Sequence, residues 1–205
     1  MKREKTVRSL FFLVGLVIQT LGISLTLISN FGAGGWDLVN VGLSSHFGLT
    51  IGTWLNIVAV ILITVSGIMN KRFPQYTCII TCFVQGIFID MWMAVLPKMH
   101  GDVFLNKFLV FMVGIIVISI GVSIYILAKF PVGSLDHFML SIQEFFHIPV
   151  GAAKMLMEGL GVVLALLLGQ KIGIGTVIVI FCIGPIIQVM LKYTTRLYDN
   201  LIKQD

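Results

Sequence analysis

The sequence contains little charge for its length. Only 11% of its 205 residues are charged, whereas 58% are hydrophobic. A soluble globular domain usually has about 25% charged and about 45–50% apolar residues. A chain of this length cannot bury so much apolar surface in a water-soluble core. The composition therefore excludes an ordinary soluble domain and predicts an integral membrane protein, with the lipid bilayer as its first partner.

Motifs for metal binding, nucleotide binding and hydrolysis are also missing. The three cysteines lie in apolar runs, where their odd number argues against a disulfide framework, and the four histidines lack the spacing of metal ligands. The sequence has no glycine-rich phosphate loop, no G-x-S-x-G and no H-E-x-x-H. The net charge of +5 reports membrane orientation rather than a nucleic-acid partner. We expect no metal, no cofactor and no enzymatic activity.

Six apolar runs are long enough to cross a bilayer as helices, since about 20 residues span its hydrocarbon core. The first run follows the basic segment MKREKTVR, but its apolar body suits a retained span better than a cleaved signal. The sequence therefore predicts an all-α membrane protein with six transmembrane helices. The expected spans are residues 10–29, 51–69, 76–96, 105–128, 150–168 and 172–191.

The lysines and arginines predict the orientation of these spans. Placing the N-terminus in the cytoplasm puts eleven of the 14 basic residues on the cytoplasmic side. Cationic loops resist translocation across the membrane, so a bias of this size is informative. We expect both termini to be cytoplasmic.

A repeat relates the two halves of the chain. Residues 22–52 and residues 121–151, aligned without gaps, share seven identities. Each half, 1–99 and 100–205, contains three expected spans. Because three is an odd number, the second half enters the membrane from the opposite side and has the inverse orientation. This predicts an inverted repeat with a pseudo-two-fold axis in the membrane plane. The identical pairs are Gly22 and Gly121, Ser24 and Ser123, Phe31 and Phe130, Gly34 and Gly133, Asp37 and Asp136, Phe47 and Phe146, and Gly52 and Gly151.

A glycine-containing connector lies between the first two spans of each half. The first reads NFGAGGWDLVNVGLSSHFGLTIG (30–52), and the second reads KFPVGSLDHFMLSIQEFFHIPVG (129–151). After the glycines, apolar and polar residues recur with helical spacing, and Ser134 is a suitable N-cap for the second copy. We predict one short amphipathic helix in each connector, which either lies in the membrane interface or dips inward as a re-entrant segment.

Four carboxylates are candidates for function. Asp37 and Asp136 fall in the first turn of the connector helices, where a carboxylate stabilises the helix start. They are also candidates for gates or ligand contacts on opposite sides of one cavity, and the two roles are not exclusive. Glu158 falls near mid-membrane, where a charge is costly, and it is either functional or paired with Lys154. Asp90 either faces the cavity or pairs with Lys98 or Lys107. The predicted substrate-binding residues are Gly34, Trp36, Asp37, Asn40, Asp90, Gly133, Asp136, His137 and Glu158.

The first connector and its flanks resemble a known family. The shared features are small residues in the first span, the GAGGWD turn, the GLTIG start of the next span, and VGSLDH in the second copy. They are similar to the YczE/YyaS/YitT group of bacterial membrane proteins. The resemblance implies an integral protein of the bacterial cytoplasmic membrane, and Gly34, Trp36, Asp37 and Asp136 match its signature. It implies no particular substrate.

Taken together, these features favour a permease that moves a small solute or ion by alternating access between inverted repeats. The helix starts after GAGG and PVGS suit an anionic group of the substrate. The alternative is an accessory or regulatory membrane protein that acts through cytoplasmic partners at its basic ends, residues 1–8 and 192–205. An intramembrane enzyme is disfavoured because no nucleophile and base are suitably spaced. The sequence leaves open whether the chain forms a homo-oligomer or is the membrane subunit of a larger complex.

Overall fold

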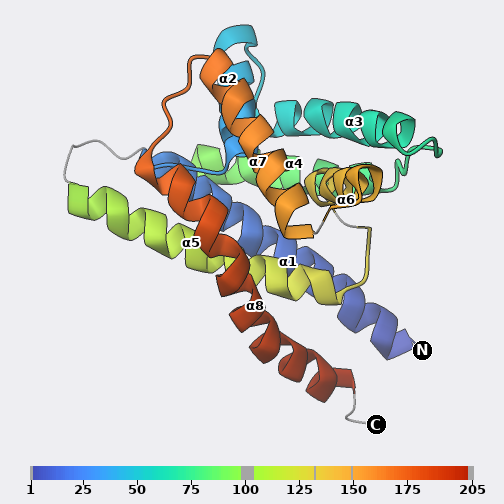
Figure 1. Ribbon diagram of the computed structural model, residues 1–205. Coiled ribbons are helices and arrows are strands. Elements are labelled where there is room, and N and C mark those ends of the chain that lie inside the picture. Colours follow the sequence, from blue (N-terminus) through green and yellow to red (C-terminus); the bar gives the residue numbers. More distant parts are fainter. Residues whose placement is uncertain (1, 98–103, 132, 149, 203–205) are drawn as a thin grey trace. The chain divides into compact units, whose positions relative to one another are not determined.

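The computed structural model describes residues 2–97, 104–131, 133–148 and 150–202. This part of the chain contains eight α-helices and no strand (Figure 1), which confirms the all-α prediction. The helices are α1 (Lys2–Ser29), α2 (Gly35–Phe47), α3 (Ile51–Met69), α4 (Cys78–Val95), α5 (Phe104–Leu127), α6 (Ser134–Phe146), α7 (Val150–Leu167) and α8 (Ile174–Ile202).

Five of these helices are long and apolar enough to cross a membrane, namely α1, α3, α4, α5 and α8. They coincide with five of the six predicted spans. The sixth predicted span is occupied by α7, whose apolar stretch, Met155–Leu167, is shorter than the others. The protein is therefore a multi-pass membrane protein.

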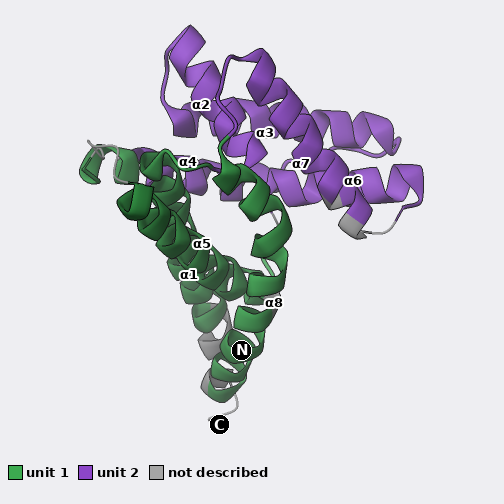
Figure 2. Cartoon of the chain, turned by 60° about the vertical axis from the view of Figure 1, so that its left-hand side comes forward, with its two compact units in different colours: residues 1–32, 91–130, 173–205 green, residues 33–90, 131–172 purple. Residues whose placement is uncertain are grey.

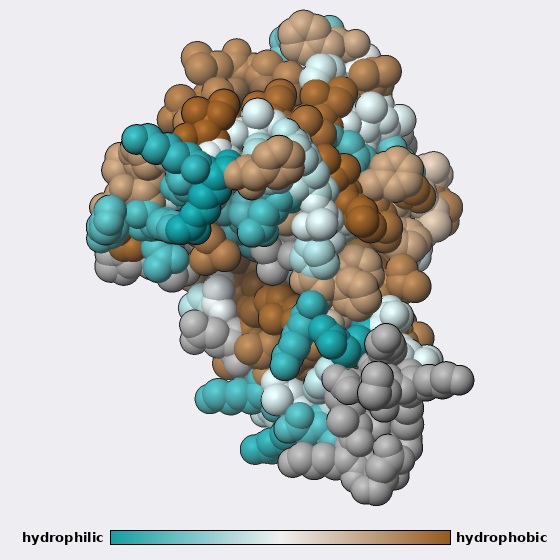
Figure 3. Space-filling model, turned by 90° about the vertical axis from the view of Figure 1, so that its right-hand side faces the viewer, coloured by the Kyte–Doolittle hydropathy of each residue, from teal (hydrophilic) through white to brown (hydrophobic). Residues whose placement is uncertain are grey.

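Large apolar side chains are exposed on the outer faces of the candidate spans. Ile68 of α3 is 73% exposed, and Ile80 of α4 is 65% exposed. Figure 3 shows broad hydrophobic areas on one face, with the hydrophilic residues gathered in separate patches. Extended apolar surfaces of this kind mark contact with a membrane or another protein. They agree with a lipid environment for these helices.

The helices form two compact units (Figure 2). Unit 1 comprises residues 1–32, 91–130 and 173–205, and unit 2 comprises residues 33–90 and 131–172. Each unit takes segments from both halves of the sequence, and α4 is divided between the units. The predicted boundary between residues 99 and 100 divides the sequence into two repeats, whereas the compact units each combine segments from both repeats.

In unit 1, α1 and α5 pack in antiparallel directions through glycines. A Cβ atom on Gly15 would lie 2.9 Å from the carbonyl oxygen of Gly121, and one on Gly22 would lie 2.7 Å from that of Gly114. The contacts advance along α1 while they recede along α5, which defines the antiparallel direction. Glycine permits this backbone approach because it has no side chain.

Contacts within unit 1 occur in pairs that an offset of 99 residues interchanges. Phe12 packs against Phe130 with ring centroids 4.7 Å apart, and Phe31 packs against Phe111 at 5.1 Å. Phe12 and Phe111 are 99 residues apart in the sequence, and so are Phe31 and Phe130. Adding 99 to Phe12 gives Phe111, and subtracting 99 from Phe130 gives Phe31, so one ring pair becomes the other. In each pair, one ring lies on a helix (α1 or α5) and the other lies in the loop after the partner helix.

The remaining helix of unit 1, α8, packs on α5. Phe111, Ile115 and Val179 form a buried core there, and Phe31 packs against it. The backbone N–H of Gly175 donates a hydrogen bond of 3.1 Å to the carbonyl oxygen of Phe31. The loop after α1 is thereby attached to the start of α8.

In unit 2, each connector helix packs against both halves of the sequence. Helix α2 lies on α3 of its own half and on α7 of the other half, while α6 lies on α7 of its own half and on α3 of the other. Both connector helices have 13 residues and follow a glycine, Gly34 (φ −58°, ψ 147°) or Gly133 (φ −62°, ψ 160°). Each is followed by a residue with positive φ, 73° at Gly48 and 54° at His147. The two connector helices therefore have the same length and a similar start, whereas their ends differ in ψ, which is −159° at Gly48 and 38° at His147.

The predicted N-cap of the second connector is wrong by one residue. Gly133 occupies the cap position, and Ser134 is already the first residue of α6. The backbone N–H of Ser134 donates to the Sγ atom of Cys82 at 3.4 Å. The first N–H of α6 thus finds its acceptor on a neighbouring helix, so the hydroxyl of Ser134 is not needed as a cap.

Candidate functional site

All nine predicted binding residues lie in unit 2 (Figure 2). The site begins where α2 meets α7. A Cβ atom on Gly35 would lie 2.9 Å from the carbonyl oxygen of Glu158 and 2.9 Å from the backbone nitrogen of Val162. The backbone of the first turn of α2 is therefore in direct contact with α7. Gly34, directly before it, has the extended backbone that ends the loop.

Trp36 attaches α2 to α7. Its Nε1–H donates a hydrogen bond of 3.0 Å to the carbonyl oxygen of Met157, and the residue is 4% exposed. The indole lies over Gly161, where a Cβ atom would come within 2.9 Å of the Cδ1 atom of Trp36. Gly161 and Met157 were not predicted. Gly161 could have been noticed as a glycine in an apolar span, which indicates close helix packing. The sequence does not show which residue packs against it.

Asp37 and Asn40 follow on α2 and differ in their surroundings. A Cβ atom on Gly34 would lie 2.8 Å from Oδ2 of Asp37, so this carboxylate folds back over the start of its own helix. That position favours stabilisation of the helix start over a role as a gate. Asn40 is 4% exposed, and its Oδ1 atom accepts no hydrogen bond from the part of the chain that the structure describes.

Glu158 is buried on α7, next to Met157 and against the start of α2. It is 8% exposed and is the one carboxylate that is buried among the side chains the structure describes. The sequence suggested Lys154 as a partner, but the side chain of Lys154 lies outside the described part. Glu158 is thus buried within the predicted span 150–168, where a charge is costly, and its functional role stays a prediction.

The start of α6 contacts α4. Thr81 donates a hydrogen bond of 2.9 Å from its Oγ1 atom to the carbonyl oxygen of Pro131. A Cβ atom on Gly133 would lie 3.8 Å from Oε1 of Gln85. Thr81, Cys82 and Gln85, which surround this helix start, were not among the predicted site residues. Their signal is a polar face on an otherwise apolar span, since these three positions fall on one side of a helix.

An aromatic contact joins the two connectors inside unit 2. The rings of Trp36 and Phe138 have centroids 6.4 Å apart and an interplanar angle of 85°. Trp36 is the second residue of α2, and Phe138 lies in the second turn of α6. This ring contact places the start of α2, which carries Asp37, near the second turn of α6, one turn after Asp136 and His137. Within the described ranges, no group of three or more His, Cys, Asp or Glu side chains is arranged to hold a metal.

His137 is expected to make the stability of the protein depend on pH. Burial lowers the pKa of its imidazole below the ordinary value of 6.5, and α6 is not one of the candidate spans. The unfolded chain then binds more protons than the folded chain in this range, so stability falls as pH drops below about 6.5 and through the lowered pKa. We expect His137→Gln to lose less thermal stability between pH 7.5 and pH 5.5 than the natural protein, measured in detergent. An identical loss in both would contradict this assignment.

The carboxylate of Asp90, on α4, lies at the start of α3, where the first connector ends. Its Oδ2 atom accepts a hydrogen bond of 2.5 Å from the Oγ1 atom of Thr50, the N-cap of α3, and its Oδ1 atom accepts one of 2.8 Å from the backbone N–H of Gly52. These bonds give Asp90 a structural role between α3 and α4. Of the two lysines suggested as partners, Lys98 lies outside the described residues.

Replacing Asp90 with leucine is expected to lower the free energy of unfolding by about 1–2 kcal/mol, because the start of α3 loses an acceptor. Asp90→Asn keeps an acceptor oxygen and should lose less. Thermal unfolding of both variants in detergent measures the difference. If the two variants are equally stable, the hydrogen bonds at Thr50 and Gly52 do not stabilise the helix start.

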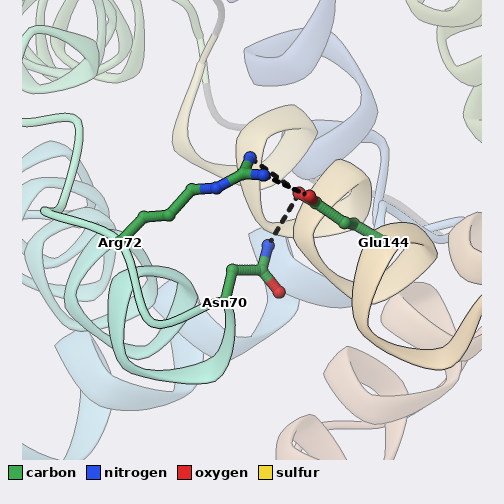
Figure 4. Close-up of polar contacts among 3 residues, drawn as sticks. All are labelled: Asn70, Arg72 and Glu144. Carbon is green, nitrogen blue, oxygen red and sulfur yellow. Dashed lines mark hydrogen bonds and ion pairs between the residues drawn. The ribbon is translucent and has the colours of Figure 1, made fainter.

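A second charged contact fixes the other end of α6 (Figure 4). An Nη2 atom of Arg72 lies 2.7 Å from Oε1 of Glu144, and Nη1 of Arg72 donates to Oε2 of Glu144 at 3.2 Å. The side-chain amide of Asn70 donates to the same Oε2 atom at 3.2 Å. The two charged side chains are 70% and 50% exposed. This contact therefore orients α6 against the end of α3 more than it stabilises the fold.

Comparisons of the sequence with known proteins identify related proteins. The profile of a family of unknown function, DUF6198, matches residues 6–192. The chain is 32% identical over 188 residues to the uncharacterized protein YyaS of Bacillus subtilis (strain 168), covering 91% of this chain and 94% of that protein. It is 29% identical over 203 residues to the uncharacterized membrane protein YczE of the same organism, covering 98% and 94%. The predicted resemblance to YczE and YyaS is confirmed. No solved structure matches significantly.

Proposed function

Because the chain belongs to the family of unknown function DUF6198, we propose its function from its own geometry: it is a permease that moves a small solute or ion by alternating access. It has six spans in two inverted repeats, with α7 as the short span. It resides in the cell membrane and catalyses no covalent reaction. Its partners are the solute and the lipid bilayer. The protein acts as a homo-oligomer or as the membrane subunit of a larger complex.

The single observation that carries this proposal is the set of contacts interchanged by an offset of 99 residues. The antiparallel α1 and α5 helices meet through Gly15 and Gly121 at one crossing point and through Gly22 and Gly114 at the other. The offset converts each contact into the other. Antiparallel packing of equivalent helices is what an inverted repeat with an axis in the membrane plane requires, and many secondary transporters have this symmetry.

The two connectors are the proposed gates. Each packs on the second span of the other half, so the halves cannot separate as rigid bodies without breaking the contacts of α2 with α7 and of α6 with α3. Alternating access is therefore assigned to the connectors rather than to a hinge between residues 99 and 100. When α2 is released from α7 the site opens on one side, and when α6 is released from α3 it opens on the other.

The positive charges give the proposed orientation. With both termini in the cytoplasm, Arg72 lies on the cytoplasmic side together with α6, and α2 lies on the outer side. The test uses His46→Cys and Phe145→Cys, two exposed positions that the repeat makes equivalent, in a background without the natural cysteines. A membrane-impermeant maleimide should label the first only from outside intact cells and the second only after the inner face is opened. Labelling of both from one side would overturn the inverted repeat and the permease together.

A further inference from the structure

The last part of α8 carries charge, whereas the rest of the helix carries none. Residues 174–191 contain no charged side chain, and at about 1.5 Å per residue they extend about 27 Å, close to the hydrocarbon thickness of a bilayer. Lys192 is the first charged residue after this stretch. Because α8 is a candidate span, Lys192 lies where the hydrocarbon ends. Arg196, one turn further on, lies about 6 Å beyond it, within a headgroup layer that is about 5–8 Å thick.

One face of this part of α8 packs on the other helices of unit 1. The Oγ1 atom of Thr194 donates a hydrogen bond of 3.4 Å to the carbonyl oxygen of Ser123 on α5. The ring of Tyr198 packs edge-on against Phe11 of α1, with centroids 5.1 Å apart. Thr194 and Tyr198 are four residues apart and therefore share a face of the helix. These contacts fix the last part of α8 beside the end of α5 and the first turns of α1.

Lys192 and Arg196 lie on the opposite face of this helix. Each is two residues from Thr194, and a two-residue step turns an α-helix by about 200°. Both side chains are exposed, and neither forms an ion pair or a hydrogen bond with the residues that the structure describes. The fold therefore does not use these two charges.

Two further basic residues lie at the same end of unit 1. Arg8 donates from Nε to the carbonyl oxygen of Ala128 at 2.9 Å and from Nη2 to that of Lys129 at 3.3 Å, which fixes α1 to the end of α5. The side chain of Lys129 is exposed. Among the side chains described at this end, Asp199 is the one carboxylate. We define the basic surface as Arg8, Lys129, Lys192 and Arg196.

The surroundings of the basic surface favour a phospholipid headgroup as its partner. Tyr193 and Leu197 directly follow the two cations of α8, and they are 63% and 53% exposed. They are four residues apart and form an exposed apolar strip beside the charges. Tyrosine next to basic residues is typical of the membrane–water boundary, where the apolar side chains enter the acyl layer. The anions present at that depth are the phosphate groups of the lipids.

We propose that the basic surface binds the headgroups of anionic phospholipids, with Lys192 and Arg196 in contact with phosphate groups and Tyr193 at the boundary with the acyl chains. The excess of positive charge selects anionic over zwitterionic lipids, since each lysine or arginine near an anionic membrane surface strengthens binding about fivefold. The guanidinium of Arg196 is able to donate two hydrogen bonds to one phosphate. This inference needs only that α8 spans the membrane, and it does not rest on the proposed transport.

The test measures the thermal unfolding midpoint of the purified protein in detergent micelles to which phosphatidylglycerol or phosphatidylcholine is added. Phosphatidylglycerol should raise the midpoint more than phosphatidylcholine does. High salt should reduce the difference, because it screens exposed charges. Inorganic phosphate should act no differently from sodium chloride at equal ionic strength. Equal rises with the two lipids, or the same rise with inorganic phosphate, would overturn the proposal.

Variants of the two α8 cations locate the effect. Lys192→Gln should raise the fraction of phosphatidylglycerol that gives half of the full rise about fivefold, and Lys192→Gln combined with Arg196→Gln about 25-fold. Without lipid, both variants should unfold at the midpoint of the natural protein, because the fold does not use these charges. The exchange Lys192→Arg with Arg196→Lys keeps both charges and should keep the effect.

Lys171→Gln is the matched control, since it removes an exposed lysine from unit 2. It should leave the dependence on phosphatidylglycerol unchanged. If Lys171→Gln weakens the effect as much as Lys192→Gln does, the response follows net charge alone, and the basic surface is not a lipid site.

Discussion

Gly22→Leu is expected to remove a large part of the stability of the protein and to lower the yield of folded molecules. A Cβ atom at this position would overlap the backbone nitrogen of Ile118 and would lie 2.7 Å from the carbonyl oxygen of Gly114. Both atoms belong to the backbone of α5, which cannot move aside as a flexible side chain can. Overpacking of a core typically costs about 1–3 kcal/mol, and a clash with a helix backbone should reach or exceed the upper end. The total stability of a protein is about 5–15 kcal/mol.

The measurement is the yield of monodisperse protein in mild detergent, followed by its thermal unfolding midpoint. Gly184→Leu is the matched control in the same unit, because a Cβ atom on Gly184 meets nothing within 4 Å. Leucine also has the higher helix propensity, so this control should be as stable as the natural protein. If both replacements lower the yield and the unfolding midpoint equally, then close packing of α1 on α5 is not the reason why glycine is needed at position 22.

The sequence predicted the helices well because their causes are local. An apolar run of about 20 residues has few alternatives to a membrane helix, and several glycines in close succession, as in GAGG, are unfavourable within a helix. The spans at 10–29, 51–69, 76–96, 105–128 and 172–191 therefore correspond to helices that can cross a membrane. The two connector helices follow their glycines for the same reason. Helix starts were less certain, since the first residue of α6 depends on Cys82 of another helix.

The candidate site was predicted only in part, because its contacts are set by packing between distant segments. The residues flagged by chemistry all fall in unit 2. Nothing in the local sequence of Trp36 shows that it lies over Gly161, 125 residues later. Nor does the sequence around Asp90 show that its carboxylate binds the start of α3. Charge and polarity identified the residues, and their roles required the tertiary contacts.

Gly161→Leu is expected to release α2 from α7 and to stop transport while the rest of the fold survives. A Cβ atom on Gly161 would lie 2.9 Å from Cδ1 and 3.0 Å from the backbone nitrogen of Trp36. A leucine therefore displaces both the ring and the start of α2, and the hydrogen bond from Trp36 to Met157 is lost. The expected cost is about 1–3 kcal/mol, confined to unit 2. In the permease, one gate could then no longer close.

Fluorescence reports this displacement independently of transport. In a background with Trp54→Phe and Trp92→Phe, Trp36 is the one remaining tryptophan of the three in the chain. Its emission should move to longer wavelength in Gly161→Leu, because a residue that is 4% exposed enters a more polar environment. Gly159→Leu, two residues away on the same helix, is the control, since a Cβ atom there meets nothing within 4 Å. It should leave both emission and uptake unchanged. If Gly161→Leu moves the emission but not the uptake, then α2 is attached to α7 for stability, and the gate must be assigned to α6 alone.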